Sequence, residues 1–163
     1  MSQHRILIVE NDGNFRKTLR ECLVIAGFSV VEATTRTQAE SVAHQQKYSA
    51  IIMDVRLSND GDEHDWNGLV SARYFGQRKV PVIILSAFDK QEDIDRAYNV
   101  APRVPPPDAF ISKNDPHWGE KVVATLNEIL ESQKGTKSWF SRNWEQIMDF
   151  LLGLAGRLFP RLK

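Results

Sequence analysis

Short apolar runs alternate along this chain with longer segments in which apolar residues recur every three or four positions. The runs predict five strands, at residues 5–9, 28–33, 50–53, 80–85 and 109–111. Helical spacing follows each run, at residues 15–26, 34–47, 68–77, 89–98 and 115–130. The run Ala50–Met53 is apolar throughout, which is typical of a strand buried on both faces of a parallel sheet.

Five alternations of strand and helix predict a doubly wound α/β domain. Its five-stranded parallel sheet is flanked by helices, because right-handed crossovers place helices on both faces. In such folds the reactive site lies at the carboxyl ends of the strands. The residues at these ends are Glu10, Asn11, Asp12, Asp54, Ser86 and Lys113. No glycine-rich phosphate loop follows the first strand, which weakens nucleotide-binding versions of the fold.

The composition indicates a basic C-terminal segment and a reducing cellular compartment. Of 163 residues, 42% are hydrophobic and 26% charged, as in a globular domain with a short appendage. The 21 basic and 21 acidic residues cancel, but from residue 132 onward there are 6 basic and 2 acidic ones. Cys22 has no partner for an internal disulfide, so we expect a buried side chain in a reducing compartment. We expect no secretory signal at the N-terminus. We therefore expect a cytoplasmic protein.

The residues at the strand ends suit the transfer of a phosphoryl group onto a carboxylate. Asp54 would attack phosphorus as the nucleophile, while a metal ion held by carboxylates neutralises the incoming oxygens. Ser86 and Lys113 would hold the remaining oxygens of the product. Mg²⁺ suits this work, because it favours a few carboxylate oxygens, water and a substrate phosphate.

At these residues the chain resembles the receiver domain of two-component response regulators, a flavodoxin-like (βα)5 fold. The matching pieces, in the family's order, are "ILIVEND", "AIIMDVRL" ahead of "NGL", "VPVIILSA" and "DAFISK". The resemblance covers residues 5 to about 131. It implies phosphorylation of Asp54 by a histidine kinase or phosphotransfer protein, with Mg²⁺ as the cofactor.

The resemblance also implies roles for other residues. The metal ligands would be Glu10, Asn11, Asp54 and the backbone carbonyl of Arg56. Ser86 would be the switch hydroxyl and Phe110 the aromatic residue that reorients on activation. Lys113 would contact the phosphate, and Phe88 would help to control water access.

Several positions depart from the family pattern. Asn11 stands where a second acid is usual, and an uncharged amide should bind Mg²⁺ more weakly; the alternative is a turn residue. Asp12 is either a compensating ligand or, more in keeping with its position, the N-cap of the first helix. Two loops are also unusual: "SNDGDEHDWNG" is long and acidic, and "NVAPRVPPPD" is stiffened by proline.

The chain continues beyond what a bare receiver needs. We expect a receiver domain at residues 1–131, a linker at 132–138 and an amphipathic helix at 139–163. Apolar residues of this last segment recur at spacings of three and four, which predicts one helical face. It would pack as a structural helix, self-associate or bind a partner's groove, or lie on an anionic membrane surface. It is too short for a helix-turn-helix domain, so we expect no nucleic acid partner.

Three functions follow. The first is a stand-alone receiver that signals through protein contacts with an unknown downstream protein. It would catalyse its own phosphotransfer and hydrolysis without being a metabolic enzyme. The second is a receiver-like adaptor that is not phosphorylated and has a weakened metal site. The third, a small phosphatase of the haloacid dehalogenase type, is disfavoured because its nucleophile would follow the first strand with a second Asp two residues on.

Overall fold

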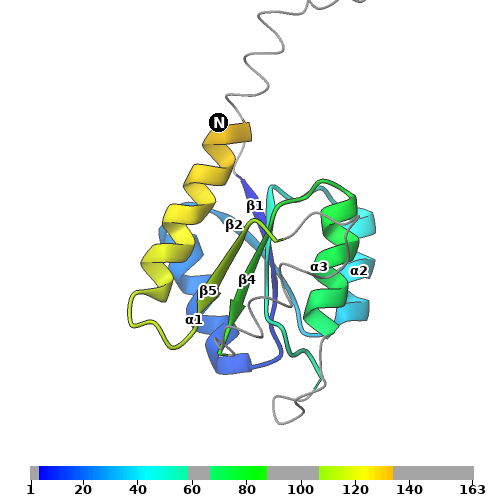
Figure 1. The fold of residues 1–163 in the computed structure, drawn as a ribbon, viewed down its shortest axis with the longest axis horizontal. Coiled ribbons are helices and arrows are strands. Elements are labelled where there is room, and N and C mark those ends of the chain that lie inside the picture. The colour runs from blue at the N-terminus through cyan, green and yellow to red at the C-terminus, as the bar shows by residue number, and fades with distance from the viewer. Residues whose placement is uncertain (1–3, 59–66, 88–106, 134–163) are drawn as a thin grey trace, which may run out of the picture. The chain divides into compact units, whose positions relative to one another are not determined.

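The computed structural model describes residues 4–58, 67–87 and 107–133 of the chain (Figure 1). By its internal contacts the chain divides into two units, Met1–Leu126 and Asn127–Lys163. The strands found in the described residues, and the candidate site residues among them, belong to the first unit. The predicted helix at 89–98, Phe88 and the predicted tail helix at 139–163 lie outside the described residues.

A five-stranded parallel sheet forms the centre of the first unit. Its strands are β1 (Arg5–Val9), β2 (Ser29–Ala33), β3 (Ala50–Met53), β4 (Val82–Ser86) and β5 (Ala109–Ser112). They lie in the order β2-β1-β3-β4-β5. β2 therefore lies on one side of β1, and β3, β4 and β5 follow on the other side. Right-handed crossovers in opposite directions place helices on both faces of the sheet. This confirms the predicted doubly wound α/β fold.

Three helices of the described residues connect these strands: α1 (Gly13–Ile25), α2 (Arg36–Gln45) and α3 (Asn67–Gln77). A fourth helix, over residues 118–133, follows β5. α1 lies on one side of the sheet with the beginning of this last helix, and α2 and α3 lie together on the other side (Figure 1). In the part of the chain that the structure describes, no helix is long and apolar enough to cross a membrane.

The helix boundaries differ from the sequence expectations where side chains cap the backbone. α1 begins two residues early, at Gly13, because the Asp12 carboxylate accepts the N–H groups of Asn14 at 2.8 Å and Phe15 at 3.1 Å. Asp12 is thus the N-cap of α1. The last helix begins at residue 118 rather than 115, because the Asp115 carboxylate accepts the N–H of His117 in a turn.

The core follows the apolar runs. Every residue of β3 and β4 is buried, as are four of the five residues of β1, which matches strands covered on both faces. Cys22, expected in the core, is only half-buried. Its Sγ lies 3.9 Å from the carbonyl oxygen of Gly119, so it packs at the contact between α1 and the last helix rather than within the sheet layer.

Candidate functional site

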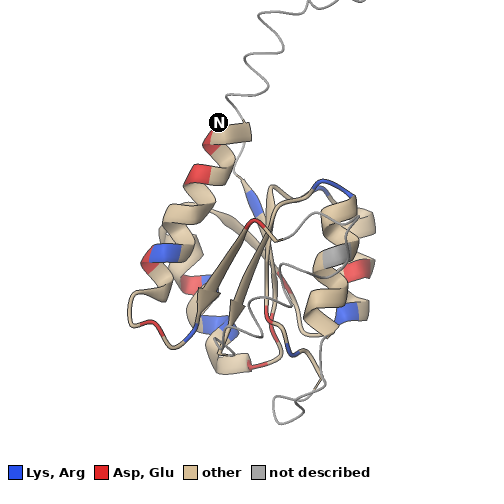
Figure 2. Cartoon of the chain, viewed as in Figure 1, with Lys and Arg blue, Asp and Glu red and all other residues tan. Residues whose placement is uncertain are grey.

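The register of the strands brings the candidate residues together at one edge of the sheet. Val9 of β1 is aligned with Met53 of β3, so the residues that follow them, Glu10 and Asp54, leave the sheet side by side. Ser86, the last residue of β4, is aligned with Ser112 of β5. Lys113 therefore emerges beside it. Acidic and basic positions meet at this end of the sheet, towards which the arrows of β4 and β5 point (Figure 2).

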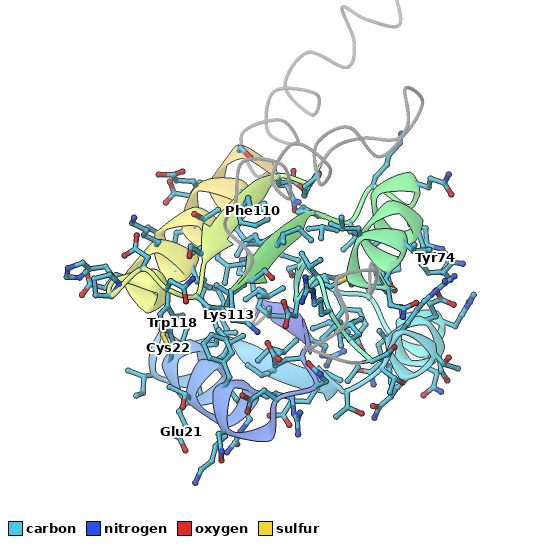
Figure 3. All side chains as sticks on the ribbon, turned by 60° about the horizontal axis from the view of Figure 1, so that its bottom comes forward. Glu21, Cys22, Tyr74, Phe110, Lys113 and Trp118 are labelled. Carbon is cyan, nitrogen blue, oxygen red and sulfur yellow. The ribbon has the colours of Figure 1, made fainter. Side chains whose placement is uncertain are left out.

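Lys113 joins the two acids. Its Nζ lies 2.6 Å from Oε2 of Glu10 and 2.7 Å from Oδ2 of Asp54. The exposed fractions of the three side chains are 12%, 3% and 7% respectively. Figure 3 shows Lys113 directed inward beneath β5, between the sheet and α1. The site is thus a nearly buried ammonium held by two carboxylates.

The surroundings of Glu10 and Lys113 shift the pKa values of both groups. Desolvation, with the nearby charge of Asp54, raises the pKa of Glu10 from 4.5 to about 6, against the opposing attraction of Lys113. Desolvation alone would lower the pKa of Lys113, but the carboxylates of Asp54 and Glu10 outweigh it and raise that pKa overall. The ammonium of Lys113 is therefore charged at neutral pH.

The backbone around Asp54 fixes the direction of its carboxylate. Oδ1 accepts the N–H of Val55 at 2.7 Å, which leaves Oδ2 facing Lys113. Gly68, at the beginning of α3, packs directly on this turn: its N–H donates to the carbonyl of Val55 at 2.9 Å. A Cβ atom at Gly68 would lie 1.7 Å from the carbonyl oxygen of Asp54. Only glycine allows α3 to approach the turn this closely.

The loop after β1 is held by its own polar contacts. The Asp12 N–H donates to Oε1 of Glu10 at 3.0 Å. Nη1 of Arg16 donates to the carbonyl of Glu10 at 2.8 Å and of Asn11 at 3.3 Å, while its Nε lies 3.5 Å from Oε2 of Glu32 in β2. Arg16 thus ties the loop to the neighbouring strand. The sequence pattern did not reveal this role, because a surface arginine of a helix usually faces water.

The loop after β5 is joined to the end of β4. The Lys113 N–H donates to the carbonyl of Ser86 at 2.8 Å, and Nδ2 of Asn114 donates to the carbonyl of Ala87 at 3.0 Å. Ser86 is fully buried. Phe110 of β5 is half-buried and packs against the core on the far side of the strand from Lys113 (Figure 3).

The donor set at this edge fits Mg²⁺. Glu10 and Asp54 supply two buried carboxylates, and Asn11 and the backbone of Arg56, buried to 6% exposure, add an amide and a carbonyl. Mg²⁺ is usually bound through one or two carboxylates and keeps several waters. Among the described residues no cluster of three or more His, Cys, Asp and Glu side chains could hold a metal, so Glu10 and Asp54 are the carboxylates that this edge offers to a cation.

The sequence matches the model of the response regulator receiver domain over residues 6–103. That match ends before β5 and Lys113, which the structure adds to the same sheet edge. β5 completes the five-stranded order β2-β1-β3-β4-β5 beyond the matched range.

Among curated proteins, the chain is similar to several regulatory proteins. It is 36% identical over 59 residues to the alginate biosynthesis transcriptional regulatory protein AlgB of Pseudomonas putida, a stretch of 36% of this chain and 13% of that protein. It is 28% identical over 152 residues to the probable transcriptional regulator ycf29 of Porphyra purpurea, covering 91% of this chain and 68% of that protein. The chain thus spans about an eighth of the AlgB length.

Solved structures show the same fold. A receiver domain protein (CheY-like) from Methanospirillum hungatei JF-1 superposes with a TM-score of 0.69 at 19% identity, covering 83% of this chain and 99% of that one. The signal receiver domain of an HD domain-containing protein from Pseudomonas fluorescens Pf-5 gives 0.68 at 18% identity, covering 82% and 99%. With the matched residues 6–103, the strand order and the sheet-edge geometry together, this chain belongs to the family of response regulator receiver domains.

Proposed function

We propose that Asp54 of this receiver accepts a phosphoryl group from a histidine kinase or a phosphotransfer protein in a Mg²⁺-dependent reaction. The single observation that carries the proposal is the position of Lys113, whose ammonium lies 2.7 Å from Oδ2 of a nearly buried Asp54. A carboxylate held in this way has its attacking oxygen beside a cation that can receive the charge of a phosphoryl group.

The phosphoryl group moves directly from the donor to Asp54. An Oδ atom of Asp54 attacks phosphorus and forms an O–P bond, while the P–N bond to the donor imidazole breaks and its electron pair stays with the ring nitrogen. With a small donor such as acetyl phosphate, a P–O bond breaks instead and acetate leaves. Lys113 then pairs with a phosphoryl oxygen, and the Ser86 hydroxyl donates to another.

Glu10, Asn11, Asp54 and the Arg56 carbonyl are the residues that would hold Mg²⁺. When bound, the ion neutralises charge on the phosphoryl oxygens. Glu10 would orient the site through a carboxylate that the Asp12 N–H already fixes at 3.0 Å. The raised pKa of Glu10 supports this assignment, because a buried acid short of counter-charge favours a cation.

Output would begin at Ser86 and Phe110. Ser86 is fully buried beneath the site and Phe110 half-buried on the neighbouring strand. A hydroxyl drawn toward the phosphate would open space for the aromatic ring, which changes the surface offered to a downstream protein. We propose that signalling proceeds through such protein contacts.

Intact mass spectrometry after incubation with acetyl phosphate and Mg²⁺ tests the proposal. We expect one added phosphate in the wild type, none in Asp54→Asn, and none in wild type with EDTA. Asp108→Asn is the matched control, since Asp108 lies at the opposite end of β5 and accepts the N–H of Val82; it should keep the adduct. An adduct that persists in Asp54→Asn would show that another residue is modified.

A receiver-like adaptor without phosphorylation is the second candidate. Lys113 neutralises part of the acid pair without any metal, and Asn11 offers no charge. Such a site would be stable as a purely structural ion cluster. No adduct in wild type at any Mg²⁺ concentration would favour this alternative.

For the segment 139–163 we propose packing or self-association, with binding to a membrane surface as the competing outcome. Light scattering of chains with and without residues 136–163 distinguishes monomers from oligomers. Flotation with anionic liposomes tests the membrane alternative. If the full chain binds the liposomes and the chain without residues 136–163 does not, membrane binding replaces packing or self-association as the role of the tail.

A further inference from the structure

An aromatic ring lies against the ammonium of Lys113. Nζ of Lys113 is 4.5 Å from the centroid of the Phe15 ring and over its face. A cation at this distance is attracted by the negative face of the ring. Phe15 stands in the first turn of α1, so the contact joins this helix to the residue after β5, and the ring is a third neighbour of the ammonium besides Glu10 and Asp54.

The ring itself is held from two sides. Its backbone is fixed because the Asp12 carboxylate accepts the Phe15 N–H at 3.1 Å. Its side chain packs on Trp118, with ring centroids 4.8 Å apart and an interplanar angle of 41°. Trp118 is the first residue of the last helix, which packs on α1 at the next residue: Sγ of Cys22 lies 3.9 Å from the carbonyl oxygen of Gly119. Figure 3 shows Trp118 and Cys22 adjacent, with Lys113 beside them.

Lys113 needs such a neighbour for its task. Its backbone is fixed by the 2.8 Å hydrogen bond to Ser86, but its side chain has four rotatable bonds and would lose much rotamer freedom on ordering. In the metal-free site its ammonium is held by Glu10 and Asp54. These acids would change partners when a metal and a phosphoryl group bind. The Phe15 ring would bind neither of them and could stay beside the ammonium.

We propose that Phe15 is a positioning residue for Lys113, supported by Trp118, and that its aromatic face keeps the ammonium in place as its carboxylate partners change. The inference rests on the proposed function for its effect on phosphotransfer. The contact between the Phe15 ring and the Lys113 ammonium does not depend on the proposed function. NMR without metal or donor reports the contact, and the phosphorylation rate reports its effect on transfer.

The contact can be observed by NMR in the full chain, with lysine labelled at the ε-carbon and no metal or donor present. Protons over a ring face move upfield, so we expect one displaced ε-CH₂ signal that disappears in Lys113→Arg. Phe15→Leu and Phe15→Met, which keep an apolar side chain without the aromatic face, should return it to the position of the other lysines. Phe15→Tyr should retain it. Phe28→Leu is the matched control, because Phe28 is a buried residue directly before β2, at the other end of the sheet. A displaced signal that is unchanged in Phe15→Leu and Phe15→Met would overturn the proposal.

The functional part is read from the rate of phosphorylation by acetyl phosphate at saturating Mg²⁺. We expect a decrease of roughly 3- to 10-fold in Phe15→Leu, from loss of the cation–π contact, and recovery in Phe15→Tyr. The Mg²⁺ concentration for half-maximal rate should not change, because Phe15 supplies no ligand. Equal rates in wild type and Phe15→Leu would overturn the role in transfer. If wild type takes up no phosphate while the NMR signal behaves as expected, the proposed function fails and the contact stands.

Discussion

Gly68 lies so close to Asp54 that a single added carbon would overlap the Asp54 carbonyl oxygen, at 1.7 Å. The contact is with backbone, which cannot rotate away as a side chain can. α3 therefore presses on the turn that carries the candidate phosphoacceptor. We therefore expect a larger residue at Gly68 to shift the backbone that carries the Asp54 carboxylate.

Gly68→Ala should destabilise the protein by about 3 kcal/mol or more, because overpacking against fixed backbone forces the turn and α3 apart. Urea unfolding followed by circular dichroism measures the effect. Gly13→Ala is the control: its added carbon would meet only the flexible Arg16 side chain at 3.8 Å, so we expect a change near zero. Equal losses in both variants would argue against the close packing at Asp54.

Stability should depend on pH through Glu10. Its pKa is raised from 4.5 to about 6 by burial and by the charge of Asp54, so the native state binds a proton more tightly than the unfolded chain. This contribution is complete below pH 4.5 and is lost as pH rises through 6. Between pH 4.5 and 7 the wild type should lose about 2 kcal/mol relative to Glu10→Gln. Urea titrations of both proteins in EDTA at several pH values check this; parallel curves would contradict it.

Asp12→Ala should cost about 1 kcal/mol, because the N-cap of α1 is lost, and Asp12→Asn should cost much less. The Asp12 carboxylate is already engaged in this cap, and the N–H groups of Phe15 and Asn14 lower its pKa. We therefore expect the Mg²⁺ dependence of phosphorylation to be the same in Asp12→Asn and wild type. A large rise in the Mg²⁺ requirement would instead identify Asp12 as a ligand.

Asn11→Asp should lower the Mg²⁺ concentration needed for half-maximal phosphorylation, because it adds a carboxylate to a site with two. A several-fold decrease is expected, measured by titrating Mg²⁺ at fixed acetyl phosphate. In metal-free buffer the same variant should be less stable than wild type, since a third acid joins Glu10 and Asp54. An unchanged Mg²⁺ requirement would mean that Asn11 serves only the turn.

The parts of this fold that depend on local sequence pattern could be predicted from the sequence. The apolar runs located all five strands, and the rule that parallel strands present their carboxyl ends together was enough to group Glu10, Asp54, Ser86 and Lys113. Helix starts were less accurate, because they depend on capping by Asp12 and Asp115. Contacts between distant side chains were beyond the pattern: nothing in the spacing of Phe15, Lys113 and Trp118 indicates that they meet.

The placement of Arg16 illustrates the same limit. On a helical wheel it is a surface residue, yet it donates to the carbonyl of Glu10 and pairs with Glu32. Its role depends on how α1 turns after the Asp12 cap, which is set by tertiary packing. The predicted boundaries at residues 131 and 138, and the tail beyond them, stay predictions.

The strand order has one more consequence, for the coupling of activity to folding. Asp54 and Lys113 are 59 residues apart in the chain, and their side chains meet only after β3, β4 and β5 have been assembled in register. A partly folded chain would hold an ordinary exposed aspartate with no ammonium beside it. If Asp54 is the phosphoacceptor proposed above, the ability to take up phosphate would depend on correct assembly of these three strands.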